Sequence, residues 1–203
     1  FQVQVPNAVS STMDTPPTVD PAAPKFVQEV TAEIMAQRGD DLPVSKMPED
    51  GTYPTDTVKW EKRNVALNVP VWDPDPCIQC GECSFACPHA VIRAKAVPEA
   101  ALASAPAYFK STDPKQKELK SAGAKYTITV SVEDCTGCSL CVQACPAINK
   151  DDRKAGVANP RKAINMHSRI EQIEAGADKA WRFFYGLPET DPALYDATKV
   201  NGI

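Results

Sequence analysis

The sequence lacks a long apolar run, an excess of positive charge and a recognisable secretion signal. Its apolar stretches are a few residues long, whereas a transmembrane helix needs about 18–20 apolar residues in a row. It has 22 Lys and Arg against 26 Asp and Glu, a formal net charge of −4, which argues against non-specific nucleic-acid binding. No charged segment with an apolar core follows Phe1. We therefore expect a cytoplasmic protein without a membrane or nucleic-acid partner.

Familiar catalytic motifs are also missing. The sequence has no Gly-rich phosphate-binding loop, no nucleophile elbow and no paired histidines. Its two histidines are His89, interpreted as a solvated or hydrogen-bonded side chain rather than a tuner of a metal centre, and His167, interpreted as structural. No catalytic residue is predicted in this chain. Because the first residue is not Met, we expect a segment of a longer protein rather than a complete subunit.

All eight cysteines lie in two short stretches, the first window at 77–88 and the second window at 135–146. They read CIQCGECSFACP and CTGCSLCVQACP, so both follow the pattern C-x2-C-x2-C-x3-C-P. In bacterial ferredoxins with this pattern, three cysteines of one run and the fourth cysteine of the other run hold each [4Fe–4S] cluster. The pattern predicts two clusters, with the ligand sets Cys77, Cys80, Cys83, Cys145 and Cys135, Cys138, Cys141, Cys87.

Two other uses of the cysteines are weaker interpretations. A zinc site can be built from C-x2-C pairs, but these cysteines are arranged as three plus one. Structural disulfides are favoured in secreted proteins, and no secretion signal is found here. Trp72 and Phe85 lie close to the first window and are predicted either to shield its cluster from water or simply to pack in the core.

The chain around the windows repeats the order strand, cysteine window, strand. Strands are predicted at 65–72 and 90–94 around the first window, and at 126–132 and 163–166 around the second. We therefore expect an α+β fold in which residues 65–167 form a ferredoxin-like 2[4Fe–4S] domain, a pseudo-twofold βαβ repeat. An insert at about 96–124, with a helix starting at Pro98, separates the two halves.

The regions on either side of this domain have a different composition. Residues 1–64 are predicted to be an extended, Pro-rich N-terminal arm with one helix between Pro24 and Gly39, whose apolar stripe is Phe26, Val30 and Ile34. Residues 168–203 are predicted to be a C-terminal connector with one helix at 168–185.

The insert is rich in lysine. Between residues 110 and 125 it has only two acidic residues, Asp113 and Glu118. The five lysines of this stretch are Lys110, Lys115, Lys117, Lys120 and Lys125. Such a run is usually a solvated face. A second hypothesis is that Lys115, Lys117 and Lys120 dock an acidic redox partner near the clusters.

Over roughly 40–190, the sequence resembles the single-chain pyruvate:ferredoxin (flavodoxin) oxidoreductases. The matching segments are LPVS at 42–45, DGTYPT at 50–55, EKR at 61–63, VWDPDPCIQC at 71–80, CPHAVIR at 87–93, DCTGC at 134–138 and RKAINM at 161–166. The resemblance includes the N-terminal arm and the long gap between Cys87 and Cys135, which short bacterial ferredoxins lack.

The resemblance implies a role in electron transfer. In that family, pyruvate is oxidatively decarboxylated on thiamine diphosphate and the acetyl group passes to coenzyme A. Electrons then leave through a proximal cluster and the two clusters of a ferredoxin-like domain, and they reach ferredoxin or flavodoxin. The thiamine diphosphate, Mg²⁺ and third [4Fe–4S] cluster would belong to other domains of a dimeric parent enzyme, because this sequence ends before them. The alternative is a stand-alone 2[4Fe–4S] electron carrier.

Overall fold

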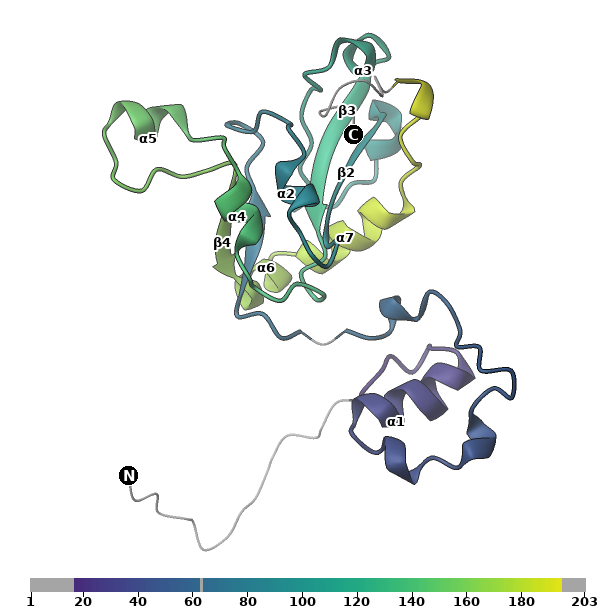
Figure 1. Ribbon diagram of the computed structural model, residues 1–203. Helices are drawn as coiled ribbons and strands as arrows, with labels where there is room; N and C mark the ends of the chain where they lie inside the picture. Colours follow the sequence, from purple (N-terminus) through teal and green to yellow (C-terminus); the bar gives the residue numbers. More distant parts are fainter. Residues whose placement is uncertain (1–16, 63, 195–203) are drawn as a thin grey trace, which may run out of the picture. The chain divides into compact units, whose positions relative to one another are not determined.

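The computed structural model describes residues 17–62 and 64–194 of the chain. The chain divides into two compact units, Phe1–Lys62 and Arg63–Ile203, and the second contains all eight cysteines (Figure 1). Among the described residues, no helix has the length and apolar character needed to cross a membrane.

The first unit is built around one helical segment. A π-helix, η1 (Val27–Thr31), leads into α1 (Ala32–Met35), and the 3₁₀ turns η2 (Gly39–Asp41), η3 (Val44–Lys46) and η4 (Thr57–Lys59) follow. The core consists of Val19, Ala23, Val27 and Ala32, with Met35 and Trp60 packed against it.

The predicted apolar stripe of this helix is correct only in part. Val30 is buried, but Ile34 is exposed, and Val27 and Thr31 take the remaining inward positions. The cause is the wider π turn, in which the Ala32 N–H bonds to the Val27 carbonyl five residues back and rotates the following residues.

The second unit contains two antiparallel pairs of strands. β1 (Asn68–Trp72) pairs with β4 (Ile164–Ser168), and β2 (Ile92–Pro98) pairs with β3 (Ala124–Val130). The strand before each window therefore pairs with the strand after the other window. This is the pairing that a pseudo-twofold repeat produces, with mixed helices and strands as expected for a ferredoxin-like domain.

Short helices connect these strands. α2 (Glu82–Phe85) and α4 (Leu140–Ala144) lie inside the two windows and pack against each other. The insert holds a 3₁₀ helix, η5 (Glu99–Leu102), where a helix from Pro98 is predicted, and then α3 (Lys117–Ser121). A projecting loop after the second window carries α5 (Lys150–Lys154), which stands away from both sheets in Figure 1.

The region after β4 forms two helices where the sequence predicts one. α6 (Arg169–Glu174) and α7 (Ala177–Gly186) are separated at Gly176, whose φ of 102° no continuous helix can contain. η6 (Pro192–Leu194) follows. The prediction of a single helix at 168–185 is thus wrong, because Gly176 adopts a left-handed conformation that most residues avoid.

Candidate metal centres

The eight cysteines of the second unit gather at two cavities. Cys77, Cys80, Cys83 and Cys145 line one cavity, which we call site 1. Cys87, Cys135, Cys138 and Cys141 line the other, which we call site 2. The two cavities are of equal size, about 310 Å³ each when the space open to solvent is counted. These are the groupings of the two predicted ligand sets, with the fourth cysteine of each window carried to the site of the other.

Left-handed residues bend both windows in the same way. Gln79 and Gly137, each two residues after the first cysteine, have φ of 58° and 72°. Their N–H groups donate to the sulfurs of Cys77 and Cys135, at 3.3 Å in both windows. Each loop thus curls around its first cysteine and points a backbone dipole at the sulfur, which stabilises negative charge there.

Gly137 also meets a steric requirement. A Cβ atom at this position would lie 3.2 Å from the Asn68 carbonyl oxygen and 3.4 Å from the Ala66 side chain. The second window therefore lies directly against the chain entering β1, and only glycine combines this close approach with a positive φ.

The helices α2 and α4 place the remaining ligand candidates. α2 contains Cys83 and precedes Cys87, while α4 contains Cys141 and precedes Cys145. Because α2 packs against α4, the cysteine that follows each helix reaches the opposite site. The main hydrophobic core includes Cys77, Cys83, Cys135, Cys141 and Cys145, so both sites are built into the centre of the unit.

Burial makes several of these thiols hard to ionise. The pKa of Cys83 is raised to about 12, mainly by burial and to a smaller extent by repulsion from the neighbouring Cys77 and Cys145. Burial likewise raises the pKa of Cys141 to about 11, with repulsion from Cys135, Cys138 and Cys87 as a smaller cause. These thiols therefore stay protonated at neutral pH unless a metal displaces the proton.

The residues around the two sites differ, although the open surface of both cavities is almost entirely apolar. Site 1 is walled mainly by apolar side chains, among them Trp72, Ile78, Ile128 and Ile164. Site 2 includes the polar Thr136, Ser139 and the exposed His89 together with Pro70, Val91 and Met166. Cys138 of site 2 is exposed, whereas three of the four cysteines of site 1 are buried. Site 2 is consequently the more accessible to solvent.

Of the two aromatic residues considered as shields, only Trp72 lies at a site. Trp72 is 3% exposed, lines site 1 and makes an edge contact with Tyr126. Phe85 is 89% exposed. It follows Cys83 by two positions on the single turn α2 and so points away from the side that the cysteine occupies. Shielding by Phe85 is therefore wrong for this unit.

The predicted docking lysines do not share one environment. Lys115, Lys117 and Lys120 are all exposed residues, but the Lys115 ammonium group also donates to the carbonyl of Cys77 at 2.6 Å, whereas Lys117 and Lys120 lie on α3. Lys125 pairs with Asp113 at 2.7 Å and with Glu99 at 3.7 Å. Lys115 and Lys125 therefore make contacts within the unit, whereas Lys117 and Lys120 form an exposed positive surface on α3.

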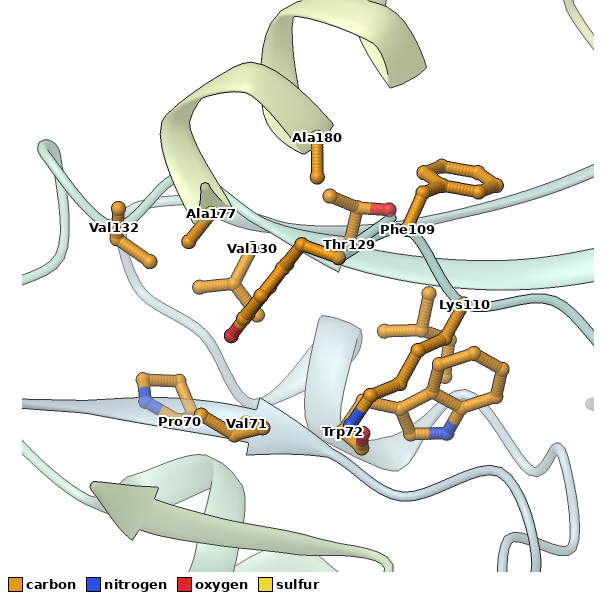
Figure 2. A pocket seen from close by; sticks show the side chains of 12 residues that line it. Pro70, Val71, Trp72, Phe109, Lys110, Thr129, Val130, Val132, Ala177 and Ala180 are labelled. Atoms are coloured by element: carbon orange, nitrogen blue, oxygen red, sulfur yellow. Dashed lines mark hydrogen bonds between the residues drawn. The ribbon is translucent and has the colours of Figure 1, made fainter. Parts of the chain in front are cut away.

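A third cavity lies beside these sites, under α7 (Figure 2). Pro70, Tyr108, Lys110, Val130 and Ala180 are among its lining residues. Figure 2 shows Lys110 extending across it toward Trp72, and the Lys110 ammonium group donates to the Trp72 carbonyl at 2.9 Å. This cavity is apolar apart from a few groups and holds no candidate ligand for a metal.

The donor set fits iron–sulfur clusters better than a single ion. Among the described residues, no group of three or more His, Cys, Asp or Glu side chains is arranged to hold one metal ion. A zinc ion needs four donors converging at about 2.0–2.3 Å. Cysteines spaced around a cavity, with backbone N–H groups directed at their sulfurs, suit a larger polynuclear cluster.

Sequence reasoning missed one residue of the first window that supports site 1 without lining its cavity. Gln79 is 9% exposed, and its side-chain amide donates to the Asp113 carbonyl and accepts from the Lys115 N–H, at 2.9 and 2.7 Å. The sequence signal that could have identified Gln79 is the difference between CIQC and CTGC. The third position of this motif is glutamine in the first window and glycine in the second, and both residues have a left-handed conformation.

Comparison with known protein families identifies two regions. Residues 76–149 match a family described as a 4Fe–4S dicluster domain, and residues 12–66 match a domain of unknown function named EKR.

Proteins with extensive similarity come from several bacteria. A putative pyruvate-flavodoxin oxidoreductase of Synechocystis sp. is 49% identical over 205 residues, which cover 99% of this chain and 16% of that protein. The pyruvate-flavodoxin oxidoreductase of Nostoc sp. is 51% identical over 84% of this chain and 13% of its own length. A probable pyruvate-flavodoxin oxidoreductase of Escherichia coli is 50% identical over 87% of this chain and 14% of its own length. The chain thus spans about a sixth or less of these relatives.

Proposed function

We propose that this chain, which is homologous to a segment of the pyruvate-flavodoxin oxidoreductases and carries a 4Fe–4S dicluster domain, conducts electrons through two [4Fe–4S] clusters. Cys77, Cys80, Cys83 and Cys145 would hold the cluster at site 1. Cys135, Cys138, Cys141 and Cys87 would hold the cluster at site 2. The observation that carries the proposal is the pair of cavities, each lined by three cysteines of one window and the fourth of the other.

The clusters supply reversible one-electron chemistry when bound, and the chain supplies the environment. The N–H groups of Gln79 and Gly137 stabilise ligand sulfurs, and Trp72 keeps water from site 1. Both sites lie in one core, which fixes the separation across which an electron passes. In this proposal, the chain transfers electrons and none of its residues breaks or forms a bond in pyruvate.

In the complete enzyme, we propose that the electrons come from oxidative decarboxylation of pyruvate. Thiamine diphosphate, Mg²⁺ and a further [4Fe–4S] cluster would reside in domains outside this chain. The N-terminal region, predicted as an extended arm over residues 1–64, instead belongs to a compact unit with its own core. Residues 65–167 would be the electron-transfer domain, and residues 168–203 a connector toward the thiamine domain. Flavodoxin or ferredoxin would accept the electrons, and the parent would be a homodimer. The names of the relatives support flavodoxin as one acceptor.

The first test is low-temperature electron paramagnetic resonance of the anaerobically purified, dithionite-reduced chain, with spins counted. Two adjacent clusters should give close to two spins per chain and a magnetically coupled signal. A folded, fully metallated chain without this signal, containing zinc but no sulfide, would refute the proposal. A native gene product of about 22 kDa would instead favour the stand-alone carrier.

The shared ligation has a separate test that uses matched variants. Cys87→Ala should damage the cluster at site 2, and Cys145→Ala should damage the cluster at site 1. Iron and sulfide content, together with the resonance signal that remains, would identify the surviving cluster. Loss of the site 1 cluster alone in Cys87→Ala would show that each window holds its own four cysteines.

A further inference from the structure

A lysine of the insert contacts the backbone of a candidate ligand. The Lys115 ammonium group donates to the Cys77 carbonyl at 2.6 Å. Among the lysine and arginine side chains of the described residues, Lys115 alone donates a hydrogen bond to the backbone of one of the eight cysteines. In the part of the chain that the structure describes, no carboxylate forms an ion pair with Lys115. Its charge is therefore not neutralised by an acid next to site 1.

Gln79 holds Lys115 in this place. The Gln79 amide bridges the Asp113 carbonyl and the Lys115 N–H, while the Gln79 N–H bonds to the Cys77 sulfur. The insert and the first window are thus joined through one nearly buried side chain. The bond to its N–H holds the backbone of Lys115 where its side chain can reach the Cys77 carbonyl.

Site 2 has no equivalent arrangement. Gly137 occupies the position of Gln79 and has no side chain with which to hold an insert. None of the described side chains donates to the Cys135 carbonyl, as Lys115 does to that of Cys77. The Lys162 ammonium group donates to the carbonyls of Val142 and Gln143, which follow Cys141, but not to the carbonyl of a cysteine. Arg93 and Arg169 donate to the carbonyls of Ala90 and Ala66, which are not candidate ligands either. The pseudo-twofold symmetry is therefore broken at Lys115.

We propose that Lys115 is a positioning charge that raises the reduction potential of the cluster at site 1 selectively, and that Gln79 serves to hold it there. The inference rests on the proposed function, since it requires a cluster at each site. Reduction adds one electron to a cluster that is already negative with its thiolates, and a nearby positive charge favours the reduced form. Electrons would consequently favour site 1 over site 2 more strongly with Lys115 than without it.

The test compares three variants of the full, cluster-loaded chain. Lys115→Met removes the charge and keeps the aliphatic stem, Lys115→Arg keeps the charge, and Lys117→Met removes an exposed charge from the same insert. The shifted NMR resonances of the cysteine β-protons, assigned to individual ligands, report the reduced fraction at each site in samples poised at known potentials.

In Lys115→Met, the ratio of reduced to oxidised cluster at site 1 should fall about tenfold at a fixed potential, which is about 59 mV for a one-electron couple. Site 2 should change much less, and Lys115→Arg and Lys117→Met should leave site 1 close to the wild type.

Three results would overturn the inference: no shift in Lys115→Met, equal shifts at both sites, or the same shift in Lys117→Met. Failure of the proposed function itself would be distinguishable, because the wild-type chain would then lack the two clusters before any potential is measured.

Discussion

At the scale of single residues, Trp72, at the end of β1, is the candidate shield of site 1 against water. Its ring is almost fully buried, lines the cavity and contacts Tyr126 at a centroid distance of 6.3 Å. Phe85 belongs to the same window region but lies in solvent. The two aromatic residues therefore form a matched pair for testing what protects a cluster.

Trp72→Ala should destabilise the chain by about 3–5 kcal/mol, because it leaves a cavity in the core. It should also make the cluster at site 1 bleach faster in air, since water and oxygen would reach it. Phe85→Ala should change neither property. The measurements are thermal unfolding under anaerobic conditions and the decay of visible absorbance after exposure to air. Equal decay in both variants would show that Trp72 only packs.

The candidate site was more predictable at this scale than its surroundings. The positions of the eight cysteines depend on spacing within two short loops, and spacing can be read from sequence. The bond from Lys115 to the Cys77 carbonyl depends on a long-range contact, in which the Gln79 side chain binds the insert at Asp113 and Lys115. Composition cannot distinguish such a lysine from Lys117, which is also exposed but makes no such bond.

At the scale of elements, the segment after α7 closes the free edge of β2. The Ala96 N–H donates to the Thr190 hydroxyl at 2.8 Å. The buried Lys95 ammonium group donates to the Leu187 carbonyl at 2.7 Å and pairs with Glu189 at 2.8 Å. The end of α7 is thereby fastened to the strand that follows the first window.

Thr190→Val should remove this acceptor without changing the shape of the side chain. The Ala96 N–H would be left buried without a partner, and the free energy of unfolding should fall by about 1–3 kcal/mol. Thr190→Ser keeps the hydroxyl and should lose much less. Thermal unfolding and hydrogen exchange at the Ala96 amide would measure the difference. If the valine and serine variants were equally stable, this bond would contribute nothing.

A comparison of predicted and observed element boundaries shows which parts of the fold can be predicted from the sequence. Four strands are present near the predicted positions because alternation is local, although β2 extends to Pro98 and β1 begins only at Asn68. The break at Gly176 and the π turn at Val27–Thr31 were not predicted. Both depend on the tertiary packing of their surroundings, and neither has a sequence signal comparable to a proline.

At the scale of the molecule, the exposed lysines of α3 remain the predicted docking surface for an acidic partner. Lys117 and Lys120 lie on this helix in the insert, whereas Lys150 and Lys154 lie on α5, in the projecting loop (Figure 1). The two pairs carry the same charge on different parts of one unit.

Changing Lys117 and Lys120 together to Glu should slow electron delivery to flavodoxin or ferredoxin by about tenfold at low salt, because encounter of an acidic partner is steered by charge. The effect should shrink as salt screens the charges. The matched control changes Lys150 and Lys154 to Glu. Rates would be measured by stopped flow across a range of salt concentrations. Equal slowing by both double variants would indicate a net-charge effect rather than a docking site.

The crossed pairing of the strands has a consequence for biosynthesis. β1 cannot form its strand pair until β4 has been synthesised. Site 1, which contains the first three cysteines, is incomplete until Cys145, the last cysteine of the chain, has been added. Site 2 likewise combines Cys87 with cysteines of the second window. If the proposed ligation holds, a ribosome that stalls between the windows releases a chain with no complete cluster site. Cluster insertion would then follow synthesis of both halves and would mature the two sites together.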